Sequence, residues 1–138
     1  MLKDALGGYR GTVGELDRII GEHPDNAEAF YHRANAKSCS GDFDGAVRDF
    51  TIAIGIGLRF REMIAAYGNR ALAKMETGDI PGAMADFSEI IARKPGNRRL
   101  LRSAYLNRAL LRQREGDAEG AARDRELATF CTPETKQQ

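Results

Sequence analysis

The chain has 138 residues, of which 42% are hydrophobic and 30% charged, and its formal net charge is +1. These values exclude a disordered tail, and no apolar run approaches the roughly 18 residues of a membrane span. With only Cys39 and Cys131 present, a four-cysteine zinc site and a disulfide scaffold are also excluded. The first residues lack the apolar core of a signal peptide, so we expect a cytoplasmic location.

In chain order, the first predicted element is a helix over about residues 9–22. Its apolar residues recur at helical spacing and predict one buried face: Val13, Leu16, Ile19 and Ile20. Only residues 1–6 precede its turn, which is too short for a partner helix. We therefore expect residues 1–26 to form half of a helical hairpin. A homodimer contact through its uncovered face is a hypothesis.

A Gly-Asp turn then recurs at Gly41-Asp42, Gly78-Asp79 and Gly116-Asp117. Glycine ends a helix because it accepts a left-handed backbone, and aspartate begins the next helix by capping free N–H groups. An aromatic residue precedes each glycine by eleven positions, and an alanine precedes it by seven. Large residues that alternate with small ones at helical spacing predict two tightly packed helices around each turn.

The predicted elements are therefore three hairpins, over residues 27–60, 61–97 and 98–133, followed by a tail at 134–138. Together with the half hairpin they make about seven helices in a single all-α domain, in which neighbouring hairpins stack to bury their apolar faces. Counted from Gly7, successive turn glycines lie 34, 37 and 38 residues apart. We expect the added residues to lengthen the first helix of the second and third hairpins by one turn.

This order of residues resembles the tetratricopeptide repeat family over about residues 7–133. The resemblance rests on the aromatic residues, the alanines, the Gly-Asp turns, a later phenylalanine and a closing proline, together with Asn69-Arg70-Ala71 and Asn107-Arg108-Ala109. It implies an αα-hairpin solenoid with a right-handed superhelical twist. It also implies a non-catalytic scaffold or adaptor whose first helices line a concave groove for a protein or peptide.

On the matching positions, the groove would present residues from all three hairpins: Tyr31, His32, Asn35, Asn69, Leu72, Met75, Asn107, Leu110 and Arg114. Asparagine both donates and accepts hydrogen bonds, so it can hold a peptide backbone of any sequence. The alternative is that these asparagines only brace neighbouring helices.

An Arg–Asp pair is predicted inside each hairpin. The arginine lies eight residues before the turn glycine and the aspartate eight after it, so both lie about 12 Å from the turn on antiparallel helices. We interpret the pairs as structural. They are Arg33–Asp49, Arg70–Asp86 and Arg108–Asp124. A second cation follows each arginine by four residues, on the same helix face, at Lys37, Lys74 and Arg112.

No catalytic, metal or cofactor site is expected, so we predict a protein that is not an enzyme. His23 and His32 have no partners at metal-ligand spacing. The N-terminal glycines lack the preceding strand and the Gly-Lys-Ser/Thr of a phosphate loop.

Two alternatives to a free-standing interaction module stay open. One is a substrate-recruiting fragment of a larger enzyme or secretion assembly. The other is electrostatic nucleic-acid binding through residues 93–138, which carry eleven basic and six acidic side chains. No nucleic-acid motif or stacking aromatic accompanies these charges, so a protein or peptide is the favoured partner.

Overall fold

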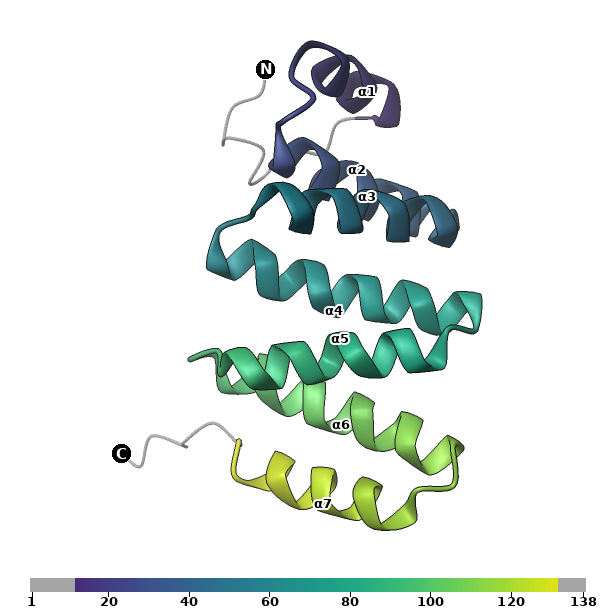
Figure 1. The fold of residues 1–138 in the computed structure, drawn as a ribbon, viewed down its shortest axis with the longest axis vertical. Helices are drawn as coiled ribbons and strands as arrows, with labels where there is room; N and C mark the ends of the chain where they lie inside the picture. The colour runs from purple at the N-terminus through teal and green to yellow at the C-terminus, as the bar shows by residue number, and fades with distance from the viewer. Residues whose placement is uncertain (1–11, 132–138) are drawn as a thin grey trace, which may run out of the picture. The chain divides into compact units, whose positions relative to one another are not determined.

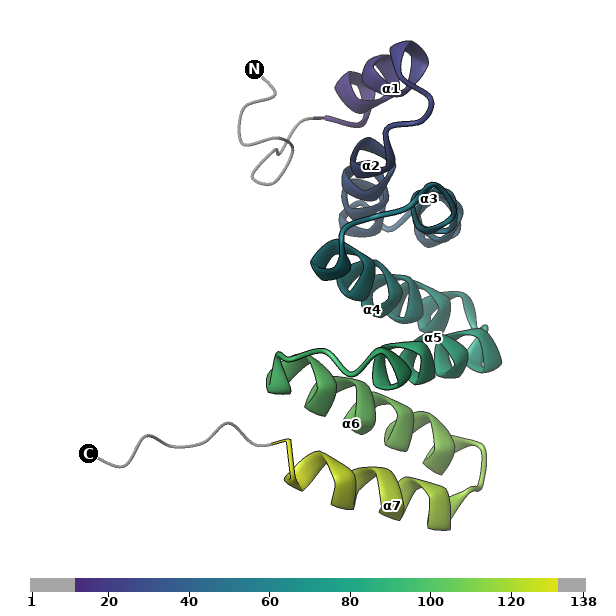
Figure 2. The same cartoon turned by 60° about the vertical axis from the view of Figure 1, so that its left-hand side comes forward.

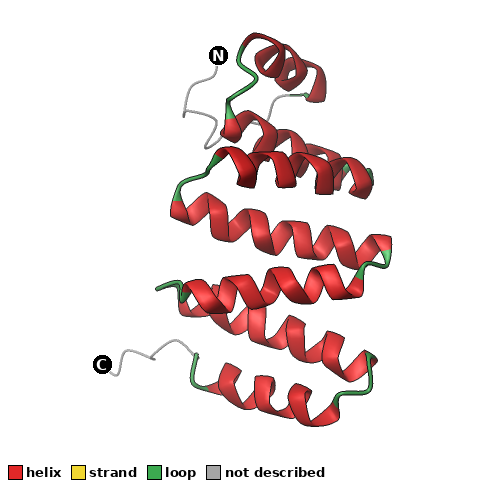
Figure 3. Cartoon of the chain, in the orientation of Figure 1, coloured by secondary structure: helices red, strands yellow, loops and turns green. Residues whose placement is uncertain are grey.

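The computed structural model describes residues 12–131, and every regular element within them is a helix (Figure 3). Seven helices alternate with short turns, which confirms the predicted all-α architecture. Contacts between helices divide the chain into two compact units, Met1–Asp79 and Ile80–Gln138. The boundary falls inside the predicted hairpin 61–97. No helix in the described range is both long and apolar enough to cross a membrane.

The first unit contains four helices, coloured purple to teal in Figure 1: α1 (Val13–Glu22), α2 (Ala27–Cys39), α3 (Phe43–Ile56) and α4 (Phe60–Thr77). Each helix packs on the next one along the chain, and α2 also contacts α4. The second unit contains α5 (Ile80–Arg93), α6 (Arg98–Arg114) and α7 (Ala118–Thr129). Here α6 packs on both of its neighbours, as Figure 2 shows.

Helix lengths agree with the spacing of the turn glycines. The first helix of the first full hairpin, α2, has 13 residues, whereas α4 has 18 and α6 has 17. The residues added to the later repeats therefore extend the start of these two helices. Gly57, with a φ of 119°, ends α3 before the longer α4 begins.

The Gly-Asp turns have the backbone geometry that their sequence predicts. Gly78 ends α4 in the left-handed conformation, with a φ of 86°, and Gly41 and Gly116 have nearly the same φ. The backbone N–H of Asp79 donates to the carbonyl oxygen of Lys74 at 2.8 Å, closing the last turn of the helix. At the other two turns the aspartate carboxylate caps the next helix, accepting from a backbone N–H at 2.8–2.9 Å.

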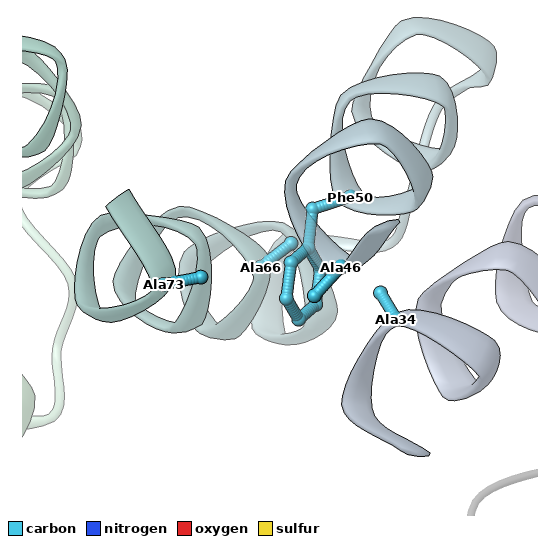
Figure 4. Close-up of a cluster of buried hydrophobic side chains, with 5 residues drawn as sticks. All are labelled: Ala34, Ala46, Phe50, Ala66 and Ala73. Atoms are coloured by element: carbon cyan, nitrogen blue, oxygen red, sulfur yellow. The ribbon is translucent and has the colours of Figure 1, made fainter. Parts of the chain in front are cut away.

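Small residues let the helices of the first unit approach closely around one large ring. Phe50 of α3 is fully buried and packs with alanines of α2, α3 and α4, and its ring points into the space among them in Figure 4. These alanines are Ala34, Ala46, Ala66 and Ala73. Since packing of this density leaves few voids, the core fixes the relative placement of α2 and α4, which carry the site described below.

The apolar face of α1 is covered in part within the chain. Leu16 and Ile19 are buried in a cluster with Ala29 of α2, and Ile20 packs against it. The expectation that this face lacks cover is therefore wrong for Leu16 and Ile19, because α2 itself supplies the partner surface. Positions 9–11 of the predicted helix lie outside the described residues. The homodimer contact stays a prediction. The side chains of Leu16 and Ile19 are buried and not available to it.

Candidate functional site

A hollow of about 540 Å³ lies in the first unit, over α2 and α4. Four of the predicted groove residues line it, namely two asparagines, a leucine and a methionine. The complete lining is Asn35, Ser38, Cys39, Phe43, Asn69, Leu72, Ala73, Met75 and Glu76. The α2 and α4 members recur every three or four residues, in part as adjacent pairs, so each helix presents one continuous face to the hollow.

Two asparagine amides join the two helices at this hollow. The Asn69 Nδ2 donates to the Asn35 Oδ1 at 3.1 Å. Among residues 12–131 neither amide makes a further hydrogen bond, so the Asn35 N–H groups and the Asn69 carbonyl oxygen can pair with a ligand. The bracing role and the binding role are therefore compatible in this pair.

The rest of the hollow combines an apolar floor with a small number of polar groups. Phe43 and Ala73 pack into the core cluster from this side, and Leu72 is 48% exposed. The Ser38 hydroxyl is buried and makes no hydrogen bond within the described part of the chain. A buried hydroxyl without a partner costs about 1–3 kcal/mol.

Tyr31 and His32 lie on α2, but they do not line the hollow. The Tyr31 ring packs edge-on against Phe50, with ring centroids 6.0 Å apart, and against His32 at 5.2 Å. Burial lowers the pKa of His32 below its ordinary value, and the nearby charges of Glu28 and Glu62 oppose that shift only in part. His32 is therefore a neutral, half-buried packing residue near pH 7.

The remaining predicted groove residues belong to the second unit, on α6. Asn107 lines a separate hollow of about 480 Å³, together with Arg99, Arg102, Ser103 and Leu106. The Asn107 Nδ2 donates to the Ser103 Oγ at 3.3 Å. Leu110 and Arg114 are exposed on the same helix and lie outside this hollow.

The aspartate of the first full hairpin is a buried charge that two cations contact. Asp49 is 2% exposed and accepts from the Arg33 Nε at 2.7 Å and from its Nη2 at 2.8 Å. Lys37 approaches the same carboxylate at 2.9 Å. Burial alone would raise the pKa of Asp49, but hydrogen bonds from Arg33 and Lys37 outweigh it and leave the pKa below its ordinary value. Arg33 also reaches Asp17 of α1 at 2.7 Å, so it ties three helices together.

The same arrangement recurs in the second unit. Arg108 donates to both oxygens of the buried Asp124 at 2.8–2.9 Å, and Arg112 adds a third contact at 2.9 Å. Arg108 also lies over the ring of Tyr105, as Arg33 lies over Phe30. These paired arginines and aspartates hold neighbouring helices together, and the hollows are lined by other side chains.

The third predicted pair, Arg70–Asp86, would join residues of the two units, and it stays a prediction. Within the first unit, Arg70 donates to the Thr51 Oγ1 at 3.1 Å and lies 5.5 Å from the centroid of the Tyr67 ring. Asp86 is 3% exposed.

Five of the nine lining residues of the first hollow are not among the groove residues given above, and Phe43 and Ala73 are two of them. Phe43 is the first residue of α3, a position that the repeat pattern treats as part of the turn. Ala73 follows Asn69 by four residues, so helical spacing puts it on the same face of α4 as Asn69.

Comparison with known proteins supports the fold. No protein-family model matches the chain, and no curated protein matches it in sequence. Two crystal structures of MamA are similar to it at 21% identity, with TM-scores of 0.76 and 0.75, and each alignment covers 86% of this chain. The chain spans only 66% and 61% of the length of those two chains. At this identity the likeness bears on architecture alone, and the architecture that it supports is a tetratricopeptide-type helical repeat.

Proposed function

We propose that the chain is a non-catalytic protein-interaction module that binds an extended peptide in the hollow over α2 and α4. One observation carries this proposal: the amide pair Asn35–Asn69 lies beside the apolar side chains of Leu72 and Met75 in one hollow. Amides that both donate and accept can hold a peptide backbone, and the apolar surface beside them can hold a side chain.

The chemistry of the lining favours binding over catalysis. Cys39 and Ser38 are the nucleophile types present, and the hollow has no histidine among its lining residues to activate either. Nor does any group of three or more His, Cys, Asp or Glu residues in the described range have a geometry that could hold a metal ion. The Asn35–Asn69 bond and the alanine core hold the hollow in place before a ligand arrives, which lowers the entropy cost of binding.

A peptide-display selection on the full chain, followed by affinity measurement with the selected peptide, tests the proposal. The variant Leu72→Asp places a charge on the apolar wall, at a side chain that is 48% exposed, so we expect the fold to be retained. We expect it to weaken binding at least about tenfold, because the ligand side chain would bury an unpaired carboxylate.

The matched control is Ile52→Asp on α3, in the same unit and 42% exposed, but outside the hollow. It should bind the peptide as the unmodified chain does. Equal affinities for the unmodified chain and for Leu72→Asp would exclude this hollow as the peptide site.

A further inference from the structure

The end of α3 and the start of α4 expose three large apolar side chains at one junction. Ile52 and Ile56 lie four residues apart on one face of α3, and each is 42% exposed. Phe60, the first residue of α4, is 51% exposed and follows Ile56 through the loop at the left of Figure 1. Single exposed apolar residues are ordinary, but a group of them marks an interaction surface. We call Ile52, Ile56 and Phe60 the junction patch.

The corresponding positions of α5 carry charges instead. The turn glycines before α3 and α5 are 37 residues apart, so Ile52 corresponds to Glu89. In the same way, Ile56 corresponds to Arg93. These two charged residues form an ion pair, with 3.1 Å between the Arg93 Nε and the Glu89 Oε1. The repeat therefore accepts a solvated ion pair at this place, and the isoleucines of α3 are not a requirement of the fold.

Three arginines lie beside the junction patch. Arg48 precedes Ile52 by four residues on the same face of α3, and Arg59 and Arg61 flank Phe60. All three arginines are exposed, and none forms an ion pair within the described part of the chain. Arg59 is also the N-cap residue of α4, and its side chain makes no capping hydrogen bond. Their guanidinium groups are therefore available to an anion.

The same stretch exposes no acid. Residues 45–61 contain one acidic residue, Asp49, whose carboxylate is buried and held by Arg33 and Lys37. Glu62, the next acid along the chain, has its Oε2 buried. The junction thus presents positive charge and apolar surface together, which fits an anionic partner with an apolar interior.

We propose that the junction patch binds the surface of an anionic lipid bilayer. Ile56 and Phe60 would enter the boundary between headgroups and acyl chains, and Arg59 and Arg61 would pair with lipid phosphates. Arginine suits this depth, because its methylene groups pack on apolar atoms while its guanidinium stays with the phosphates. No residue of the patch lines the hollow over α2 and α4, so the proposal is independent of peptide binding.

The size and charge of the patch favour a bilayer over a second copy of the chain. Nine of residues 48–61 are exposed, whereas each side of a stable protein–protein interface has about 20–30 residues. Two patches in contact would also bring their arginines together without an acid between them. A bilayer needs no matching surface, and it supplies both phosphates and acyl chains.

Flotation of the full chain with vesicles tests the proposal. One set of vesicles contains phosphatidylcholine and phosphatidylglycerol in equal parts, and the other contains phosphatidylcholine alone. We expect the unmodified chain to bind the first set at low salt and to bind the second set far more weakly, because the arginines need anionic lipid.

Ile56→Ser/Phe60→Ser removes the apolar contacts. We expect it to weaken binding to the anionic vesicles at least about tenfold, and the loss to persist at higher salt. The matched control is Leu100→Ser/Leu127→Ser, which removes two leucines of the second unit that are 43% and 42% exposed. The control should bind within about twofold of the unmodified chain. Circular dichroism should show that both variants keep its helical content.

Arg59→Gln/Arg61→Gln removes two of the charges. Each basic residue near an anionic bilayer contributes to binding, so we expect a loss of about thirtyfold at low salt. This loss should shrink as salt screens the charges. The matched control is Arg123→Gln/Arg125→Gln, which removes two exposed arginines from α7 and should lose much less affinity.

Tryptophan fluorescence gives a second measurement. The chain has no tryptophan, so Phe60→Trp introduces a single reporter at the junction patch. We expect its emission to move to shorter wavelength with the anionic vesicles, and brominated lipids to quench it, because the ring leaves water. In the control Leu127→Trp the emission should not change.

The proposal is wrong if the unmodified chain does not float with the anionic vesicles at low salt, or if each variant and its control lose binding equally. Unchanged emission from Phe60→Trp would show that the patch stays in water. Light scattering that gives a dimer for the unmodified chain and a monomer for Ile56→Ser/Phe60→Ser would assign the patch to a second copy instead.

Discussion

The variant Arg33→Ala tests the physical basis of the first unit. Arg33 donates two hydrogen bonds to the buried Asp49 and a third to Asp17. Its removal leaves the Asp49 carboxylate with Lys37 as the one cation that the structure shows beside it. The variant therefore strands a charge that is 2% exposed, rather than simply deleting a surface contact.

Removing one partner of a buried ion pair costs about 3–5 kcal/mol of unfolding free energy. The Arg33 side chain is 17% exposed, and Lys37 stays 2.9 Å from the carboxylate, so we expect the low end of that range. A loss of about 3 kcal/mol is a large part of the 5–15 kcal/mol that holds a typical domain together. It corresponds to a fall in Tm of roughly 10 °C for a chain of this size.

Urea unfolding followed by circular dichroism measures this loss, with Arg48→Ala as the matched control. Arg48 is the exposed neighbour of Asp49 on α3, so its removal should change the free energy by less than about 0.5 kcal/mol. The double variant Arg33→Met/Asp49→Leu should recover most of the loss, because no carboxylate is left buried and unpaired. If Arg33→Ala and Arg48→Ala unfold at the same urea concentration, the buried-charge argument is wrong.

Three further predictions follow from the same contacts. Because the pKa of Asp49 is lowered, its ionised carboxylate contributes fully to the free energy of unfolding above the unfolded pKa of about 3.9, and this contribution is lost as pH falls through the folded pKa. Asp49→Asn should therefore flatten the acid side of a plot of unfolding free energy against pH. His32 has a lowered pKa, so protonation favours the unfolded chain below pH about 6.5, and NMR titration should give a pKa under that value. Gly78→Ala should cost about 1 kcal/mol in thermal unfolding because φ is 86°, whereas Gly55→Ala, in open space within α3, should be neutral or stabilising.

The architecture was predictable because each hairpin repeats its own local signals. Gly78 and Asp79 mark the end of one helix and the start of the next through backbone physics that needs no distant partner. The long α4 and α6 followed from the added residues in the repeat spacing. The division of the chain at Asp79 was not predictable, because it depends on contacts between helices that no local pattern encodes.

The residues of the candidate site were predictable only in part. The resemblance to the repeat family put Asn69, Leu72 and Met75 in the groove, and all three line one hollow in the structure. The same resemblance assigned Tyr31 to the groove, yet its ring packs against Phe50, because a large aromatic gains more from the core than from solvent. Which side of a helix faces the core is set by the neighbouring helix, and one helix's sequence does not specify that neighbour's position.

The side chains that stabilise the first unit differ from those that line the proposed binding hollow. Phe50 and Asp49 of α3 are buried and hold the first unit together, whereas Leu72 at the hollow is 48% exposed and contributes little to the core. A change at Leu72 can therefore alter ligand preference with a small change in unfolding free energy. Since the buried charge and the alanine packing constrain the placement of α2 and α4, the hollow keeps its shape while its lining changes. This separation predicts that the peptide affinities of Leu72 variants vary widely while their urea midpoints of unfolding stay close together. Binding and urea unfolding measured in parallel on one set of Leu72 variants test this prediction.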